Sequence, residues 1–210
     1  MSDSEYPDFP ESERSADDLS ALSGSLLLAH PNLGDPNFSQ SVILLSAHSS
    51  DGGALGVILN RPCGKTLGEM FPEHGLDSIG SVEVFLGGPV QQEQLILAAW
   101  KWDEAGKIFK MFFGITRERA EELLNSEENV TIRGFLGYAG WSAGQLEAEL
   151  TVDSWIPQPI TFAVFDRPHD AELWTELMVA VSGDQALFEV AGGSDPLSAL
   201  PDPPDHVEWN

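Results

Sequence analysis

Short hydrophobic runs, separated by glycine, proline and polar residues, make up most of the central part of the chain. Their length and their β-branched and aromatic content predict strands. The predicted strands cover residues 25–30, 41–48, 53–60, 82–88, 94–100, 107–114, 130–138 and 160–165. The second and third of these strands should form a hairpin, because Asp51, Gly52 and Gly53 supply a turn in which positive φ costs little.

Helix signals interrupt these strands. Thr66 and Glu69 have the spacing of a capping box, and Thr116 and Asp170 can each cap the helix that follows them. The strands come in hairpin-like runs without strict alternation of strand and helix. We therefore expect an α+β fold, a compact single domain with a complex mixed, largely antiparallel sheet flanked by helices.

The two ends of the chain differ in composition from its middle. Residues 1–20 carry seven acidic side chains and one basic side chain, with prolines and serines between them. Residues 185–210 are similar and are interrupted by prolines. Such segments have too little apolar surface to offset the entropy of ordering. We expect an acidic disordered tail at 1–20, one domain at 21–184, and a Pro/Gly/acidic tail at 185–210.

The charge of the chain narrows the choice of partners. With 34 acidic and 10 basic residues the formal net charge is −24, which repels phosphate backbones and anionic membranes. Direct nucleic-acid binding is disfavoured, and a protein partner is favoured instead. The first 20 residues lack a signal peptide, and no apolar run is long enough to span a bilayer. The sequence thus predicts a cytoplasmic protein that makes no contact with a membrane.

Metal and cofactor signals are weak. The single cysteine, Cys63, excludes an internal disulfide and a thiolate-rich zinc site, although Arg61 and Lys65 could lower its pKa if they face it. The five histidines lack the short spacing of metal ligands. We expect no metal and no cofactor.

Residues 140–144, Gly-Trp-Ser-Ala-Gly, match G-x-S-x-G, the nucleophile elbow of serine hydrolases. A predicted strand precedes Ser142 and a helical pattern follows it, as the elbow requires. The same residues also predict a helix start, with Ser142 as the N-cap and Gln145 closing a capping box, while Trp141 packs against Leu146.

A catalytic triad in hydrolase order needs a histidine after the serine, and the candidates are His169, beside the predicted Asp170 cap, and His206 in the acidic tail. Neither position suits a triad. We favour the capping interpretation and keep Ser142 with His169 as the alternative catalytic pair.

Together the motifs resemble the YqgE/AlgH family of bacterial proteins. The resemblance lies in "GSLLLAHPNLGDPNFSQSVILL", "GALGVILNRP", "VFLGGPV", "GYAGWSAGQLEAEL" and "FDRPHDAELWTELM", which follow one another in the family's order. It implies an α+β domain of the cytosol whose activity is not established, under a transcriptional-regulator label. The family often has arginine where Gln40 stands, so an anion contact at that position is not expected in this chain.

The family's signature positions fall mostly on polar or glycine-rich loops that follow strands, where binding residues are often found. We therefore predict a noncatalytic binding or regulatory domain that acts through a protein or small-ligand partner. The predicted binding residues are Asp35, Asn60, Arg61, Gly87, Gly88, Pro89, Tyr138, Trp141 and Gln145. The alternatives are a serine hydrolase using Ser142 and a regulator that binds DNA directly.

Overall fold

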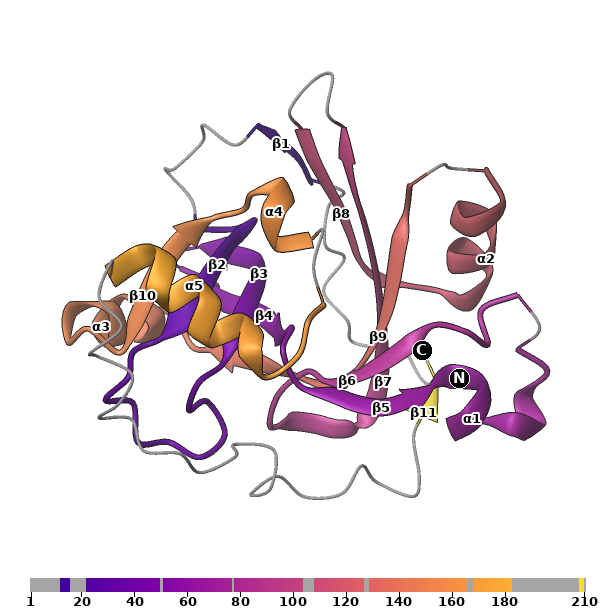
Figure 1. The fold of residues 1–210 in the computed structure, drawn as a ribbon, viewed down its shortest axis with the longest axis horizontal. Coiled ribbons are helices and arrows are strands. Elements are labelled where there is room, and N and C mark those ends of the chain that lie inside the picture. The colour runs from indigo at the N-terminus through magenta and orange to yellow at the C-terminus, as the bar shows by residue number, and fades with distance from the viewer. Residues whose placement is uncertain are drawn as a thin grey trace.

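A computed structural model describes residues 12–15, 22–49, 51–76, 78–103, 108–126, 129–165, 168–182 and 208–209. Figure 1 shows strands from both halves of the chain meeting in the middle of the molecule, with helices at its two ends. No helix in the described ranges is long and apolar enough to cross a membrane.

The strands form a mixed sheet. They are β1 (Ser12–Ser15), β2 (Ser25–Ala29), β3 (Val42–Ser49), β4 (Gly53–Ile58), β5 (Pro62–Thr66), β6 (Glu83–Leu86), β7 (Val90–Asp103), β8 (Ile108–Ile115), β9 (Thr131–Trp141), β10 (Trp155–Pro159) and β11 (Glu208–Trp209). Their order is β1-β8-β7-β9-β4-β3-β2-β10, with β6 on β9, β5 on β6 and β11 on β7. The β6–β9 and β11–β7 pairs are parallel and the others are antiparallel. This confirms the predicted α+β class with a largely antiparallel sheet.

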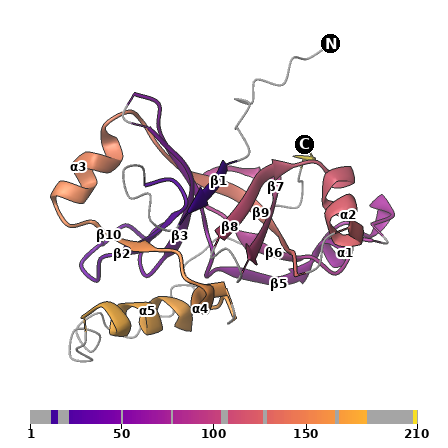
Figure 2. The same cartoon turned by 90° about the horizontal axis from the view of Figure 1, so that it is seen from above.

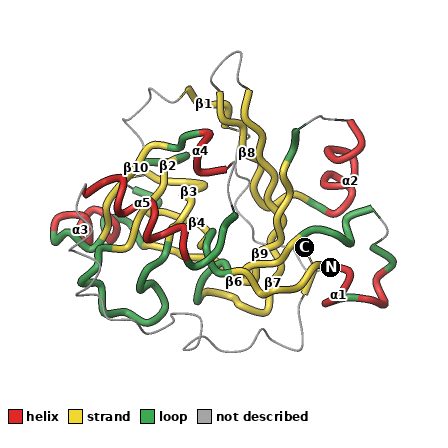
Figure 3. Tube along the Cα trace, viewed as in Figure 1, coloured by secondary structure: helices red, strands yellow, loops and turns green. Residues whose placement is uncertain are grey.

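The helices cover the faces of this sheet. They are α1 (Leu67–Met70), the 3-10 turn η1 (Pro72–His74), α2 (Arg117–Ser126), α3 (Gln145–Thr151), α4 (Phe162–Phe165) and α5 (Glu172–Ser182). Figure 2 shows α3 on one side of β2 and β3, and α4 and α5 on the other side. Figure 3 shows α1 and α2 at one end of the yellow strands and α3 at the other end. The Trp174 indole of α5 donates to the Ala29 carbonyl at 2.9 Å, which fixes α5 on β2.

Neighbouring residues of β2 point into different cores. Leu26 and Leu28 pack with α4 and α5 in the largest hydrophobic cluster, whereas Leu27 and Ala29 pack with α3 in a smaller one. A third cluster lies between β6, β7, β9 and helices α1 and α2. Because both faces of β2 are covered, its sequence is continuously hydrophobic instead of alternating.

Several local predictions are confirmed. The β3–β4 hairpin pairs Ser49 with Gly53, with Asp51 and Gly52 in the turn, and the Thr66–Glu69 capping box forms at α1. The Thr116 hydroxyl accepts a hydrogen bond from Arg119 N at 3.2 Å, and Asp170 Oδ1 accepts one from Glu172 N at 3.0 Å.

The strand predicted at residues 160–165 is wrong, because Phe162–Phe165 forms helix α4. Val164 N donates to the Thr161 carbonyl at 3.1 Å, and Val164 is buried in the largest cluster together with Ile160, which precedes the helix. Packing on the large cluster therefore overrides the β propensity of this segment.

Two strands lie inside the predicted tails, β1 within 1–20 and β11 within 185–210. All other residues of these tails lie outside the described residues. The division into two tails and one domain stays a prediction.

Candidate functional site

Residues 31–40 form a loop between β2 and β3, which we call the anchored loop. The side chain of Arg61 binds its backbone. The Arg61 side chain is buried, with the residue only 3% exposed. Its Nη1 donates to the Asn37 carbonyl at 2.6 Å, and its Nη2 donates to the Ser39 carbonyl at 3.1 Å. Arg61 therefore fixes the backbone of the loop by two charge-assisted hydrogen bonds.

Asn60 anchors the end of the same loop. Its Nδ2 donates to the Gln40 carbonyl at 2.9 Å, and its Oδ1 accepts from the backbone N–H of Val42, the first residue of β3, at 2.8 Å. Gln40 has a positive φ of 54°, a conformation that needs such support in a non-glycine residue. Asn60 thus ties the loop to the sheet.

Asp35 shapes the exposed part of the loop. Its Oδ1 accepts from Asn37 N at 2.8 Å, and its carbonyl accepts from Phe38 N at 3.0 Å and from Ser39 N at 2.8 Å. These bonds form the Asx turn expected of the Asp-Pro-Asn sequence. Residues 32 and 34–37 are exposed, so the loop presents polar groups from a fixed backbone.

Burial lowers the pKa of Arg61 to about 10, and the nearby charge of Asp35 opposes this shift. The guanidinium remains charged at neutral pH, because that pKa is still well above 7. The loop carbonyls and Asp35 together compensate a cation that would otherwise be costly to bury.

Phe38 connects the anchored loop to two tryptophans. Its ring is stacked on Trp141, with ring centroids 6.3 Å apart, and meets Trp155 edge-on at 5.6 Å. Trp141 and Trp155 themselves pack edge to face at 5.7 Å. Both indoles are buried, so Trp141 supports the loop and has little surface to offer a ligand.

Glu149 of α3, which the sequence analysis did not single out, joins these groups. Its Oε2 accepts from the indole N–H of Trp141 at 2.8 Å and from that of Trp155 at 2.7 Å. Its Oε1 accepts from Gln145 Nε2 at 2.9 Å. The i, i+4 spacing of Gln145 and Glu149 was the available signal, but the sequence does not show that two distant tryptophans converge on this carboxylate.

The predicted N-cap at Ser142 is wrong, because the N-cap of α3 is Gly144, in the left-handed conformation with φ 75°. Strand β9 continues to Trp141, and the turn that follows takes the helix start two residues further. Half of the capping box does form, since Gln145 Oε1 accepts from Ser142 N at 3.0 Å. The Gln145 N–H, however, donates to the backbone carbonyl of Ser142 instead of its hydroxyl.

The structure does not bring Ser142 and His169 together. His169 is buried against Trp100 and Phe165, and its Nε2 lies 3.1 Å from the Val164 carbonyl. Trp100 pairs with Thr131 at the start of β9, whereas Ser142 is exposed beyond the other end of that strand. Among the described residues no hydrogen bond joins the two side chains.

Gly87 and Gly88 are required for close backbone packing. A Cβ on Gly87 would lie 2.3 Å from the Gly137 carbonyl oxygen, and one on Gly88 would lie 2.2 Å from the Tyr138 carbonyl carbon. Here the chain crosses β9 where that strand passes from pairing with β6 and β7 to pairing with β4. Tyr138 packs against the largest core cluster, and Pro89 is exposed.

Backbone hydrogen bonds link the segment around Gly87 to Arg61 and to β4. Leu86 N donates to the Arg61 carbonyl at 2.9 Å, and Ile58 N donates to the Gly87 carbonyl at 2.9 Å. The structure therefore gathers Asp35, Asn60 and Arg61 at the loop, where Trp141 is stacked on Phe38. Gln145 is linked to Trp141 through Glu149, and Gly87 follows Leu86, which bonds to the Arg61 carbonyl. Tyr138 faces the large core cluster instead.

The pKa of Cys63 is raised to about 11 by burial, against the opposing charge of Lys65. Lys65 thus acts in the expected direction, but burial outweighs it, and the thiol is protonated at neutral pH. Within the described ranges no cluster of His, Cys, Asp and Glu side chains could hold a metal ion.

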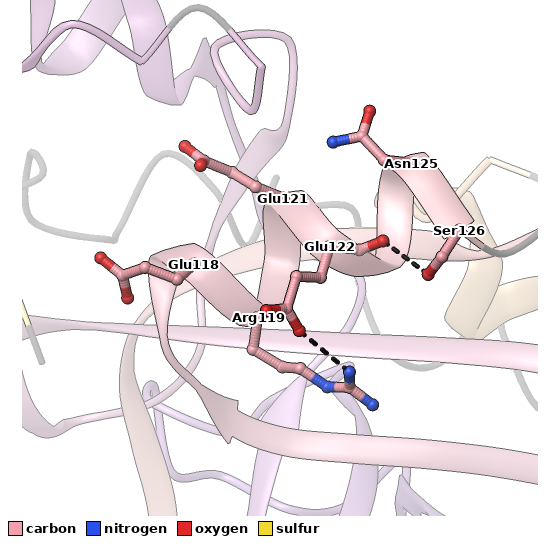
Figure 4. A pocket seen from close by; sticks show the side chains of 6 residues that line it. All are labelled: Glu118, Arg119, Glu121, Glu122, Asn125 and Ser126. Carbon is pink, nitrogen blue, oxygen red and sulfur yellow. Dashed lines mark hydrogen bonds and ion pairs between the residues drawn. The ribbon is translucent and has the colours of Figure 1, made fainter.

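A shallow hollow on α2 is lined by Glu118, Arg119, Glu121, Glu122, Asn125 and Ser126. Figure 4 shows that these side chains all come from one helix, with Arg119 paired to Glu122 at 3.2 Å. Figures 1 and 2 place α2 at the opposite end of the molecule from α3, so this hollow is not part of the site around the anchored loop.

The chain matches the AlgH-like family over residues 26–186. A UPF0301 protein of Myxococcus xanthus is 33% identical over 178 residues, which are 82% of this chain and 97% of that relative. A UPF0301 protein of Thermobifida fusca is 35% identical over 181 residues, which are 80% of this chain and 91% of that relative.

Solved structures give the same result. The solution structure of the AlgH protein from Pseudomonas aeruginosa superimposes with a TM-score of 0.59 at 27% identity, covering 84% of this chain and 97% of that chain. The crystal structure of a Corynebacterium diphtheriae protein, at 20% identity and a TM-score of 0.59, shares the fold. The family match, the two relatives and the fold agree with the resemblance found in the sequence motifs, and this chain belongs to the AlgH-like family.

Proposed function

We propose that this protein is a noncatalytic cytoplasmic binding domain that recognises a protein partner through the exposed face of the anchored loop. The observation that carries the proposal is the buried Arg61, which donates to two carbonyls of a loop that is itself largely exposed. Any regulatory role would be exerted through this partner.

The use of a buried cation at this place supports a binding role. Burying a guanidinium costs free energy, and here the compensating bonds hold the Asn37 and Ser39 carbonyls of a loop in which residues 32 and 34–37 are exposed. A loop fixed before binding loses less conformational entropy when a partner docks. The arrangement suits recognition better than it suits core stability.

The chemistry of the loop indicates the kind of partner. Residues 31–41 contain no lysine or arginine, and the exposed Asn32, Asp35 and Asn37 offer a carboxylate and two amides. The whole chain carries a net charge of −24, which attracts positively charged surfaces. We therefore infer that the partner surface is rich in lysine, arginine and hydrogen-bond donors.

The test is affinity capture from lysate with wild-type protein, Asp35→Asn and Asn37→Ala, followed by measurement of Kd for the captured partner. Asp35→Asn keeps an oxygen that can accept the Asn37 N–H, so it removes the charge but preserves the Asx turn. Glu118→Gln on α2 is the matched control, because it removes an exposed carboxylate far from the loop. We expect both loop variants to weaken binding about tenfold or more and the control to leave Kd unchanged.

Equal affinity of wild type and both loop variants would contradict the proposal. Fluorophosphonate labelling of the wild type that disappears in Ser142→Ala would replace it with the hydrolase alternative. Salt-sensitive retention on DNA would replace it with the alternative of a DNA-binding regulator.

A further inference from the structure

Two buried polar atoms lie in the aromatic part of the largest core cluster and have no hydrogen-bond partner within the described part of the chain. They are Nε of Arg133 on β9 and Nδ1 of His169, which precedes α5. Buried polar groups are nearly always paired, so two orphaned atoms in one region call for an explanation.

Both residues adjoin Trp100, His169 through its ring and Arg133 through the sheet register. The His169 ring lies 6.2 Å from the Trp100 ring at an angle of 30°. On β9, Thr131 pairs with Trp100, and Arg133 is two residues further along the same face. Arg133 is therefore the diagonal neighbour of Trp100, within reach of a long side chain.

The guanidinium of Arg133 is only partly satisfied. It lies over the Phe85 ring, 4.7 Å from the centroid, and its Nη1 is paired with the Glu83 carboxylate. The Glu83 side chain is 63% exposed, whereas that of Arg133 is 16% exposed. The Nε–H thus points away from solvent with no acceptor, and burial lowers the pKa of Arg133.

The unpaired atom of His169, Nδ1, is a hydrogen-bond acceptor in the neutral ring. Its Nε2 faces the Val164 carbonyl, which can only accept, so Nε2 carries the hydrogen and Nδ1 of the neutral ring has a free lone pair. Burial first, and then the charge of Arg133, lower the pKa of His169 to about 4, while Asp170 opposes the shift. Within the described part of the chain, the charged groups that act on the pair are Arg133 itself, Glu83 and Asp170.

We propose that Arg133 and His169 form a binding site for a small free monocarboxylate, which binds together with one proton taken up from solvent. The proton binds to Nδ1 of His169, so that Nδ1–H and the Arg133 Nε–H donate to the two carboxylate oxygens. An anion beside the imidazolium offsets the effect of burial and the repulsion from Arg133, which otherwise keep the ring neutral.

The surroundings favour this class of ligand. Trp100, Phe165 and Phe85 offer mainly apolar contacts, and among these three side chains only the indole N–H of Trp100 could donate. An anion with more oxygens, such as phosphate, would be left partly unpaired beside them. His169 is 5% exposed, which favours a small free acid over a carboxylate carried on a peptide chain. The site is separate from the anchored loop, so either proposal can fail alone.

The test is calorimetric titration of the full-length protein with sodium acetate at pH 6, in two buffers of different ionisation heat. Sodium chloride at equal ionic strength is the reference. We expect saturable binding in the millimolar range with uptake of close to one proton per acetate. Arg133→Lys keeps the charge but removes the Nε–H, and it should weaken binding about tenfold or more.

Arg119→Lys is the matched control, because the Arg119 guanidinium also lies over an aromatic ring, Phe112, and pairs with a glutamate, but is exposed. The control should bind like the wild type. No saturable binding beyond that of chloride, or equal affinity in Arg133→Lys, would overturn the proposal. If Arg133→Lys does not fold, the test is an NMR pH titration of His169 in the wild type, with and without acetate. The proposal requires acetate to raise the midpoint of the His169 titration. An unchanged midpoint overturns the proposal.

Discussion

The Glu149 carboxylate makes a quantitative prediction possible, because three side chains donate to it. In Glu149→Gln the amide oxygen can still accept from both Trp141 and Trp155, which share one oxygen in the wild type. The amide nitrogen then faces Gln145 Nε2, so a donor opposes a donor where a bond of 2.9 Å existed. The variant thus loses the charge and one hydrogen bond but very little volume.

The cost follows from general hydrogen-bond energies. A bond to a charged acceptor contributes about 2 kcal/mol and a neutral one about 1 kcal/mol, so the two indole bonds lose about 2 kcal/mol together. The Gln145 bond is exposed, so its loss adds only about 1 kcal/mol although its acceptor is charged. Glu149→Gln should therefore lower the free energy of unfolding by about 3 kcal/mol, measured by urea denaturation with tryptophan fluorescence.

A double substitution tests the reasoning itself. Gln145→Glu combined with Glu149→Gln supplies a carboxylate at position 145 that can accept from the new amide and from Ser142 N. The double variant should recover at least about 1 kcal/mol relative to Glu149→Gln, and the double-mutant cycle gives the coupling. A loss below about 0.5 kcal/mol in the single variant, or no recovery in the double one, would refute this account of the Glu149 network.

Three further outcomes are expected. Arg61→Lys should cost about 2 kcal/mol in urea denaturation, because an ammonium cannot reach both the Asn37 and Ser39 carbonyls as the planar guanidinium does; an unchanged midpoint would show that the loop is not anchored by Arg61. Gly87→Ala should cost about 3 kcal/mol through its clash with the Gly137 carbonyl, whereas Gly34→Ala, with nothing within 4 Å of its Cβ, should be nearly neutral. The pKa of His169 in the folded protein, about 4, lies below its value in the unfolded chain. The contribution of the neutral His169 ring to stability is therefore complete above about pH 6.5 and is lost as pH falls towards 4. His169→Phe should lose less stability than the wild type over that range, and parallel curves of stability against pH would contradict this.

The sequence predicted most of the strands because their hydrophobic runs and turn residues are local signals. The β3–β4 hairpin is an example, since Gly53 and the turn before it need no tertiary information. β10 was missed because Pro157 and Pro159 remove backbone donors, and such a strand can lie only at the edge of a sheet, where it pairs with β2. Helix α4 was mistaken for a strand because hydrophobic positions 160, 162 and 164 fit the period of a strand, and only the fold shows that Phe162 is exposed.

The site was predicted in part. Asp35, Asn60 and Arg61 do gather at one loop, but the sequence could not show that Asn60 and Arg61 face inward and hold the loop by its backbone carbonyls. Backbone carbonyls are present at every residue, so no sequence pattern marks the ones that a buried side chain will meet. Glu149 was missed for a related reason, because its partners Trp141 and Trp155 converge only through the fold.

The central claim is that the anchored loop is the surface that a partner contacts. Hydrogen exchange of the protein, alone and with the captured partner bound, tests it directly. The account predicts slower exchange in residues 31–40 and little change in α2 when the partner is bound. Protection confined to other parts of the chain, with exchange in the loop unchanged, would contradict it.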